Sequence, residues 1–367
     1  MITPCIFIDL KNKMKKAIIF DPYLDTLGGG ERYSLTFATQ LINLGFRVEI
    51  AWKDSETLKK AEERFGLNLE GLKLNKKAFD IFTQNTSFLK KLFFTMRYGL
   101  IFWVSDGSLP FLFSRNNLVH FQVPFKTLGG SSLTNAIKTL LVHKFVYNSR
   151  FTANVHEKHL PKTKSFVLYP PIDTASFNKG TKENIILSVA RFDSPSHSKR
   201  QDVLIKAFSI LHKTNPDYEL FLSGGSNGTS DTLALLKKQA GSLPIKFLVN
   251  PDFDKLKSLY AKSKFFWHAA GFEIDEEIDP EKVEHFGMTT VEAMSAGCVP
   301  VVIAKGGQKE IITDETGVLC STPEEMAKET GLLINNPKKL LTLTQNLEKR
   351  SLDFSITNFS RKIKSLL

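Results

Sequence analysis

The sequence predicts an α/β protein with two Rossmann-like, parallel-sheet domains that face a cleft. Short apolar strands alternate with segments of helical spacing along the chain. This alternation occurs as two series, which are separated by Pro170 and Pro171, residues that stop regular structure. Ligands of such sheets bind at the carboxyl ends of the strands, so the cleft between the domains is the expected site.

The first series contains six apolar segments of strand length, at Ala17–Phe20, Phe46–Trp52, Leu100–Val104, Leu118–Gln122, Phe145–Tyr147 and Phe166–Tyr169. Helices are expected over residues 29–44 and from Asn148 to about His159. We assign residues 1–171 to this domain. Residues 1–13 are either an upstream extension or the site of an extra edge strand at Cys5–Asp9, since Met14 also resembles a natural start.

The second series contains five expected strands, at Ile185–Val189, Glu219–Ser223, Ile245–Val249, Lys264–His268 and Val299–Ala304. Four helices are expected between them, at Gln201–His212, Thr232–Ala240, Asp254–Ser263 and Thr289–Ser295. We assign residues 172–345 to a second Rossmann-like domain, to which the resemblance described below gives the nucleotide-sugar site. Residues 346–367 are expected to form a helix that packs back on the first domain.

The composition is that of a soluble globular protein, with 42% hydrophobic and 24% charged residues among 367. No apolar run is long enough to span a bilayer, and no signal segment begins the chain, so we expect a cytoplasmic location. The three scattered cysteines indicate neither a disulfide framework nor a zinc site. The net charge of +11 suits an anionic partner, but no nucleic-acid-binding motif is present and nucleic acid is not expected.

The first candidate site is the turn Gly28-Gly29-Gly30, which is followed by Glu31 and Arg32 at the start of the first helix. Glycines let a phosphate approach the backbone, and a helix N-terminus offers free N–H groups. The turn lacks the spacing of a dinucleotide fingerprint, which argues against a nicotinamide cofactor. A flexible turn without a ligand is the structural alternative.

The second candidate site lies after the strand at Ile185–Val189, where Arg191 and then Lys199 and Arg200 precede an apolar helix. Two cations near one strand end can bind a diphosphate, because arginine offers a planar fork and lysine a compact charge. A solvated basic loop is the structural alternative.

The third candidate site is the most specific. Glu284 and Glu292 are eight positions apart, with a Phe-Gly turn at Gly287 and a helix of small residues between and after them. The turn and helix N-terminus can hold a diphosphate, and the second glutamate can accept hydrogen bonds from a ribose diol. Glutamates eight positions apart are otherwise common by chance.

These motifs, with Gly306 and Gly307 after them, resemble glycosyltransferase family 4, whose members are retaining enzymes of the GT-B fold. The resemblance extends from Met14 onward, and the segment Trp267–Gly271 is most similar to mannosyltransferase-like members. It implies transfer of a hexose of mannose or glucose type from a nucleotide-diphosphate sugar, such as GDP-mannose, to a glycan or lipid-linked glycan.

The resemblance also implies a catalytic set of residues. Arg191 and Lys199 match the pair that binds the donor diphosphate, and Glu284 matches the glutamate beside the transferred sugar. His120 is similar to the family's active-site histidine near the sugar, and Glu292 matches the glutamate that binds the ribose. Without the resemblance, His120 on its apolar strand would be interpreted as a structural core histidine.

Backbone groups complete the donor-binding set that the resemblance implies. Gly287, Met288 and Thr289 match the segment at the phosphates and sugar, and Gly29 and Gly30 match the loop that closes on the diphosphate. No cofactor and no metal are expected, because lysine and arginine take the electrostatic role of a metal in this family. The pair His156 and His159 is three positions apart, which is the wrong spacing for a helical zinc site.

The sequence departs from the family in two places. The spacing between Arg191 and Lys199 is wider than usual, which indicates an insertion at 193–198 and leaves open whether Lys199 or Arg200 binds phosphate. The acidic segment Phe272–Val283 could cap the site or recognise the acceptor, but a solvated loop is the interpretation that we favour.

An amphipathic helix is expected near residues 88–96, where five apolar side chains recur beside Lys90, Lys91 and Arg97. It is either a core-facing helix with basic edges, which we favour, or an interfacial helix on anionic lipid. The second interpretation would give a peripheral contact with the inner membrane face and a lipid-linked acceptor. The competing functions are a nucleotide-sugar epimerase of the same fold and a non-catalytic nucleotide-sugar-binding module.

Overall fold

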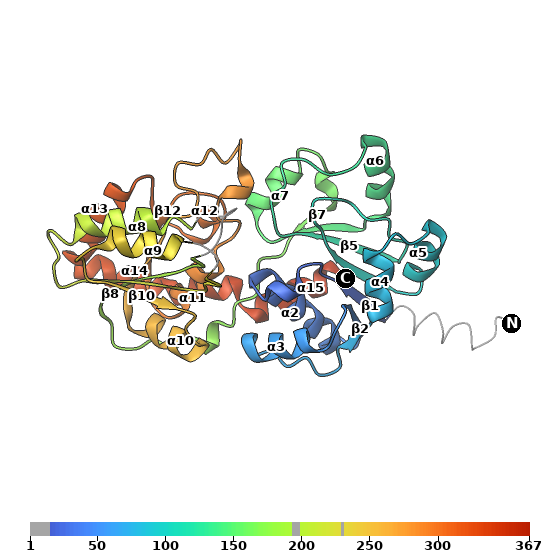
Figure 1. Cartoon of the computed structure of the whole chain (residues 1–367), viewed down its shortest axis with the longest axis horizontal. Helices are drawn as coiled ribbons and strands as arrows, with labels where there is room; N and C mark the ends of the chain where they lie inside the picture. The colour runs from blue at the N-terminus through green and yellow to red at the C-terminus, as the bar shows by residue number, and fades with distance from the viewer. Residues whose placement is uncertain (1–14, 193–198, 229–230) are drawn as a thin grey trace. The chain divides into compact units, whose positions relative to one another are not determined.

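The computed structural model describes residues 15–192, 199–228 and 231–367. The chain divides into two compact units, residues 1–169 with 360–367 and residues 170–359. The expected edge strand at Cys5–Asp9, the start at Met14 and the insertion at 193–198 lie outside the described residues. Figure 1 shows the elements of each unit in the colours of the chain.

The first unit contains a seven-stranded sheet in the order β3-β2-β1-β4-β5-β6-β7, with every neighbouring pair parallel. Its strands are β1 Lys16–Phe20, β2 Arg47–Ala51, β3 Lys73–Leu74, β4 Leu100–Val104, β5 Asn116–Phe121, β6 Lys144–Tyr147 and β7 Ser165–Val167. Its helices are α2 Gly29–Asn43, α3 Glu56–Phe65, α4 Lys76–Thr83, α5 Phe88–Thr95, α6 Ser132–Leu141 and α7 Arg150–His156.

The second unit contains a six-stranded sheet in the order β10-β9-β8-β11-β12-β13, again wholly parallel. Its strands are β8 Glu183–Val189, β9 Glu219–Gly224, β10 Ile245–Val249, β11 Ser263–His268, β12 Val299–Ile303 and β13 Val318–Cys320. Its helices are α8 Gln201–Leu211, α9 Thr232–Ala240, α10 Phe253–Lys262, α11 Met288–Ser295, α12 Gln308–Ile311, α13 Pro323–Ile334 and α14 Pro337–Ser351. The last helix, α15 Ile356–Leu366, ends in the first unit.

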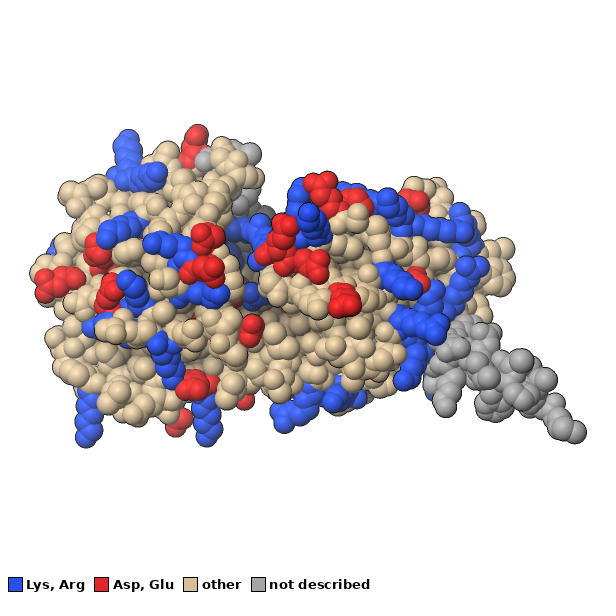
Figure 2. Space-filling model, turned by 90° about the horizontal axis from the view of Figure 1, so that it is seen from below, with Lys and Arg blue, Asp and Glu red and all other residues tan. Residues whose placement is uncertain are grey.

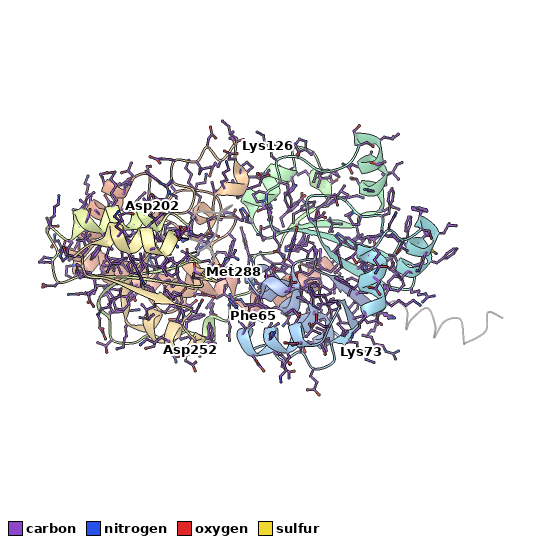
Figure 3. All side chains as sticks on the ribbon, viewed as in Figure 1. Phe65, Lys73, Lys126, Asp202, Asp252 and Met288 are labelled. Carbon is purple, nitrogen blue, oxygen red and sulfur yellow. The ribbon has the colours of Figure 1, made fainter. Side chains whose placement is uncertain are left out.

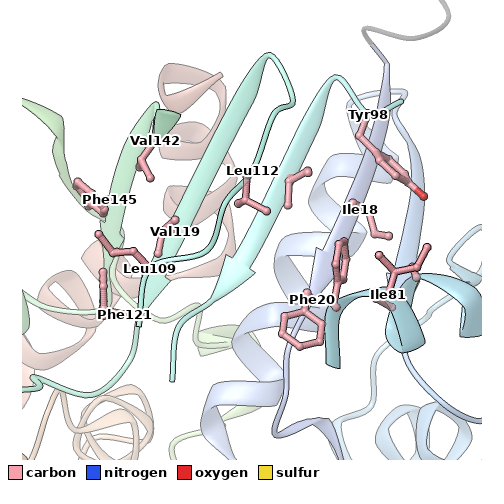
Figure 4. Packing of buried hydrophobic residues seen from close by; sticks show 14 of the residues in the cluster. Ile18, Phe20, Ile81, Tyr98, Leu109, Leu112, Val119, Phe121, Val142 and Phe145 are labelled. Carbon is pink, nitrogen blue, oxygen red and sulfur yellow. The ribbon is translucent and has the colours of Figure 1, made fainter. Parts of the chain in front are cut away.

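The central strands of each sheet are buried on both faces, which explains why they are nearly continuous apolar runs rather than alternating patterns. In the first unit Ile18, Ile101 and Val119 have no exposed surface, and they come from three different strands of the sheet. Figure 4 shows how such side chains pack with Leu109 and Leu112 from the segment between β4 and β5. The α/β class with two parallel sheets is therefore confirmed.

The strand orders create one topological switch point in each sheet. In the first sheet the chain builds outward from β1 through β2 to β3 and then returns to place β4 on the other side of β1. In the second sheet it does the same with β8, β9, β10 and β11. Loops from the carboxyl ends of the two strands at a switch point diverge, and the space between them is where such sheets bind ligands. The loops after β1, β4, β8 and β11 are therefore the places to seek a site.

Four α-helices that the sequence pattern did not predict are present among the described residues, namely α3, α4, α6 and α12. The helix expected to reach about His159 ends at His156, and β5 ends at Phe121, which leaves Gln122 beyond the strand. Within the described part of the chain, no helix combines the length and apolar character that crossing a bilayer requires.

Candidate active site

The second unit brings three side chains together at its switch point. Lys199 Nζ lies 2.8 Å from Glu284 Oε2, and His268 Nε2 lies 2.9 Å from the same oxygen. His268 is the last residue of β11, while Lys199 lies two residues before α8, the helix that follows β8. The sequence separated these residues by up to 85 positions, and the sheet order places them side by side.

This cluster keeps the Glu284 carboxyl group ionised. Burial by itself raises the pKa of a carboxyl group, but the charge of Lys199 and the hydrogen bond from His268 outweigh it and hold the pKa of Glu284 well below its usual range. An ionised glutamate with a lysine beside it can orient a polar ligand and partly neutralise an anionic one. Sequence reasoning missed His268, although its position as the last residue of a strand at the switch point was a usable signal.

Arg191 lies just beyond the end of β8 and is exposed. Its backbone carbonyl accepts a hydrogen bond of 3.1 Å from Gln201 Nε2, which fixes the loop to the start of α8. The end of β9 packs tightly here, since a Cβ atom on Gly224 would lie 1.8 Å from the carbonyl oxygen of Ala190. The loop is therefore held by its backbone, and the Arg191 guanidinium has no ion pair among the residues that the structure describes.

Lys199 and Arg200 point to different partners. Arg200 has a φ of 52° and donates hydrogen bonds to the Asp202 carboxylate and, at 2.8 Å, to the carbonyl oxygen of Phe272. Its guanidinium also lies 3.6 Å from the Glu273 carboxylate. The geometry thus places Lys199, rather than Arg200, beside Glu284.

Glycines in two segments, one before α11 and one after β12, leave no room for side chains around Glu284. Gly287 has a φ of 113° and caps α11, whose first residue, Met288, is labelled in Figure 3. A Cβ atom on Gly306 would lie 2.1 Å from the carbonyl oxygen of Glu284, and one on Gly307 would lie 2.4 Å from the Cα of Phe286. The backbone at Glu284 is therefore held by close packing against Gly306 and Gly307. The Gly307 N–H also donates a hydrogen bond of 2.8 Å to the Glu284 carbonyl.

The start of α11 exposes backbone donors next to an oriented amide. Met288 and Thr289 are half-buried in its first turn. Thr290 donates a hydrogen bond of 3.0 Å to Gln308 Oε1, and Gln308 Nε2 is buried without a partner among the described residues. A helix N-terminus with free N–H groups and an unpartnered amide donor beside it suits a negatively charged group.

Glu292 lies within α11 and is almost fully buried. Tyr260 donates a hydrogen bond of 3.1 Å to its carboxylate, and the same hydroxyl lies 3.4 Å from the Thr289 carbonyl. The structure thus places Glu284 and Glu292 on the two sides of the glycine turn, as the motif predicted. Their assigned roles stay predictions.

The acidic segment Phe272–Val283 is not wholly solvated, which corrects the interpretation that we favoured. Glu276 accepts a hydrogen bond of 2.9 Å from the Gly306 N–H and forms an ion pair with Lys309. Burial raises the pKa of this carboxyl group, but these two donors outweigh burial and lower it. Glu276 therefore holds the acidic segment against Gly306, whose neighbour Gly307 hydrogen-bonds the Glu284 carbonyl.

The first unit presents its own polar group at the carboxyl ends of β1 and β5. Gly28 is the N-cap of α2, and its N–H donates to the carboxylate of Glu31. A Cβ atom on Gly30 would lie 1.9 Å from Gln122 Oε1, and Gln122 Nε2 donates to the Gly30 carbonyl at 3.2 Å. The Gln122 side chain thus packs directly against Gly30 at the start of α2. Sequence reasoning missed Gln122.

Asp21 follows β1 directly and is completely buried, and it too was missed. Its carboxylate accepts hydrogen bonds from Ser34 Oγ at 2.6 Å and from the Tyr23 N–H at 3.0 Å. Burial, followed by the negative charge of Glu31, raises the pKa of Asp21 to about 7. Two carboxyl groups therefore compete for ionisation at the start of α2.

His120 lies in the core of the first unit, as the structural alternative described. It has no exposed surface, its Nδ1 lies 3.0 Å from the Val146 carbonyl, and its ring stacks on Tyr33 with a centroid distance of 4.3 Å. Burial lowers its pKa to about 3, so the ring is neutral. Gln122, two residues further along the chain, is half-buried and reaches the glycine turn instead.

Comparisons with known proteins agree with this architecture. Residues 171–350 match the family model of the glycosyl transferases group 1. An uncharacterized glycosyltransferase from Haemophilus influenzae is 27% identical over 391 aligned positions, which cover 96% of this chain and all of that protein.

Two further comparisons extend this result. The GDP-Man:Man(3)GlcNAc(2)-PP-Dol alpha-1,2-mannosyltransferase of Dictyostelium discoideum is 26% identical over 54% of this chain, and the match spans only 41% of that protein. The crystal structure of Anabaena Alr3699/HepE in complex with UDP and glucose superposes with a TM-score of 0.71 at 18% identity, over 96% of this chain and 98% of that one. The second likeness shows the fold alone.

The two parallel sheets and these matches define the class of protein: the chain is a glycosyltransferase of the GT-B fold. The residues that match the glycosyl transferases group 1 model, 171–350, lie in the second unit and include Arg191, Lys199, Glu284 and Glu292.

Proposed function

We propose that the chain is a retaining hexosyltransferase of glycosyltransferase family 4. It takes a hexose of mannose or glucose type from a nucleotide-diphosphate sugar and passes it to a glycan or lipid-linked glycan. GDP-mannose is the first donor to test, because mannosyltransferases recur among the relatives. UDP-glucose is the comparison donor, because the Anabaena protein of the same fold was crystallised with UDP and glucose.

One observation carries this proposal: Lys199 and His268 converge on a single oxygen of Glu284 beside the N-terminus of α11. A donor diphosphate is stabilised by positive charge. The hydroxyl groups of a sugar donate hydrogen bonds, and an ionised carboxylate accepts them strongly. Lys199 supplies the first and Glu284 the second, within contact distance of each other. The glycines at 306 and 307 hold this arrangement from the backbone side.

Charge builds on the leaving diphosphate as the sugar–phosphate bond breaks. Arg191, Lys199 and the backbone N–H groups of Met288 and Thr289 stabilise that charge, and preorganised donors of this kind are usually the largest catalytic contribution. The Gly287 turn gives the diphosphate access to these groups. No metal is required, since cationic side chains do this work.

The remaining roles follow the family resemblance. Glu284 hydrogen-bonds the transferred sugar, and Glu292 accepts hydrogen bonds from the ribose diol. In the first unit, Gly29 and Gly30 bind the diphosphate through their backbone. At β5 the proposal departs from the resemblance, which puts His120 near the sugar in the catalytic set. Because His120 is fully buried, it supports the strand end, and Gln122 is the polar side chain that contacts ligand.

The acceptor and the location are also proposed. A glycan or lipid-linked acceptor fits a cytoplasmic enzyme with a peripheral contact at the inner membrane face. Exposed apolar and basic side chains in the first unit support such a contact, and they are described below.

Calorimetric titration with GDP and UDP tests the donor site. Tight binding of one nucleotide, lost in Lys199→Ala, supports the proposal and identifies the base. Lys206→Ala is the matched control, because Lys206 lies in the middle of α8 and pairs with the exposed Glu324 at 2.8 Å. Equal losses in both variants, or binding of neither nucleotide, would contradict the assigned site.

A further inference from the structure

Helices α5 and α6 of the first unit expose large apolar side chains instead of burying them. On α5 and just after it, Phe88, Leu89, Phe93 and Met96 are 44–63% exposed, and only Phe94 and Thr95 are buried. This corrects the core-facing interpretation that we favoured for this helix. We call α5–α6 surface the set of exposed residues Phe88, Leu89, Phe93, Met96, Leu133, Ile137 and Leu140.

The apolar side chains of helix α6 are even more exposed than those of α5. Leu133 and Leu140 are 72% and 78% exposed, Ile137 is 47% exposed, and no residue of the helix is buried. Its C-terminal end is nevertheless fixed, because Lys164 Nζ donates hydrogen bonds to the carbonyls of Thr139 and Val142 at 2.7 and 2.6 Å. The helix is therefore held in place while its apolar side chains stay in solvent.

The two helices form one continuous surface. The Phe88 ring on α5 contacts Phe111 and Phe113 edge-on, at centroid distances of 5.6 and 5.5 Å. From α6, Lys138 Nζ lies 5.0 Å from the centroid of the same Phe111 ring. Figure 1 shows α5 and α6 at the same end of the first unit. Scattered apolar residues are normal on a protein surface, but a contiguous set of this size marks an interaction site.

The charge around this surface selects the kind of partner. Along the chain, Asp106 is the only acidic residue between Ile81 and His156, whereas eight residues there are basic. Three of the eight, Lys90, Lys91 and Lys138, lie on α5 and α6 themselves. Neither α5 nor α6 contains an acidic side chain. The whole chain, by contrast, has 49 basic and 38 acidic residues, and Figure 2 shows both kinds on the face that it draws.

We propose that the α5–α6 surface binds the surface of an anionic lipid bilayer. Its apolar side chains enter the headgroup region, and the neighbouring lysines and arginines bind lipid phosphates. A second copy of the chain fits less well, because a symmetric contact would bring two basic surfaces together. The proposal rests on the membrane contact of the proposed function and specifies its residues and the charge of the lipid, but it does not depend on donor binding.

Sedimentation with vesicles tests the proposal on the full chain. We expect binding to phosphatidylcholine vesicles that contain 30% phosphatidylglycerol, weaker binding to pure phosphatidylcholine, and release at high salt. Each lysine near an anionic surface contributes roughly a fivefold gain in binding, so Lys90→Glu with Lys91→Glu should weaken binding by at least about 25-fold.

A second variant separates the apolar contribution from the charge. Leu133→Gln with Leu140→Gln should weaken binding to anionic vesicles by about tenfold or more, because two exposed leucines no longer enter the bilayer. The matched control is Lys237→Glu with Lys238→Glu on α9, a helix of the second unit that also exposes a leucine, Leu235. This control should bind like the unchanged protein.

Three outcomes would overturn the proposal. The first is that the unchanged protein does not bind anionic vesicles. The second is that the α5–α6 variants bind vesicles as well as the α9 control does. The third is concentration-dependent self-association that the α5–α6 variants abolish. The last outcome would assign the surface to a second copy. Unchanged nucleotide titrations and unfolding temperatures in all variants would keep a failure here distinct from a failure of the donor site.

Discussion

Lys199 and His268 bind the same oxygen of Glu284, at 2.8 and 2.9 Å, although Lys199 lies between β8 and α8 and His268 is the last residue of β11. The arrangement depends on β8 and β11 being neighbours at the switch point of the sheet. Removing Glu284 therefore leaves both Lys199 and His268 without this acceptor, whereas removing either of them leaves the other in place.

Glu284→Gln should destabilise the protein by about 1–3 kcal/mol, because it leaves the Lys199 ammonium without its buried acceptor. Urea unfolding at neutral pH measures the change. Glu324→Gln is the control, because its ion pair with Lys206 is exposed and worth at most about 1 kcal/mol. Equal effects of the two substitutions would mean that the Glu284 cluster is no stronger than a surface pair.

Asp21 should make the protein less stable as pH rises. Its pKa is raised from 3.8 to about 7 in the folded state, so the stabilising contribution is fully present below pH 4 and is lost as pH rises toward 7. Asp21→Asn should therefore flatten the pH dependence of unfolding between pH 4 and 7 and stabilise the protein at pH 8. Thermal unfolding across this range is the measurement, with the exposed Asp80→Asn as the control. A parallel pH profile for Asp21→Asn would contradict the raised pKa.

Gly306→Ala should be far more damaging than Gly66→Ala. Both glycines have a left-handed φ, 55° and 62°, but a Cβ atom on Gly66 meets nothing within 4 Å, whereas one on Gly306 meets the Glu284 carbonyl at 2.1 Å. Gly66→Ala measures the backbone strain of the left-handed region, about 1 kcal/mol, and Gly306→Ala adds the collision. We expect an additional loss of about 2 kcal/mol or more in unfolding free energy. Similar losses of unfolding free energy in the two variants would show that the backbone at Glu284 can move away from the new methyl group.

Gln122→Ala and His120→Ala should fail in opposite ways. His120 is buried in an aromatic stack, so its truncation should cost about 2–4 kcal/mol of stability. Gln122 is half-buried against Gly30, so its truncation should leave stability nearly unchanged and reduce glycosyl transfer. Unfolding and turnover measured on the same preparations distinguish the two. Full activity in Gln122→Ala would exclude it from the site.

The strands were predictable because parallel sheets bury both faces and so produce continuous apolar runs. The predicted bounds of Thr232–Ala240 and Ile245–Val249 agree with the structure. Helix α3 was not predictable in this way, because Ala61 is its only buried residue and its other positions are mostly polar. Helix α5 was interpreted in the wrong sense, because an apolar stripe at helical spacing does not state whether it faces a core or a partner.

The candidate site was predictable only in part. Arg191, Lys199, Glu284 and Glu292 were found because each belongs to a local motif. His268 has no motif of its own and is joined to Glu284 only by the order of the strands.

The contact between Gln122 and Gly30 was hidden for the same reason, since 92 positions separate the two residues. Such pairs depend on which strands are neighbours, and a single sequence does not reveal that order.

The most direct measurement is turnover of isotope-labelled GDP-mannose and UDP-glucose with a mixture of glycan and lipid-linked acceptors. We predict that label from one donor enters an acceptor with its anomeric configuration retained, and that Lys199→Ala lowers the rate by about 10²–10³-fold. Label that remains in a free or epimerised nucleotide sugar, or turnover that Lys199→Ala leaves unchanged, would contradict glycosyl transfer at the Glu284 cluster.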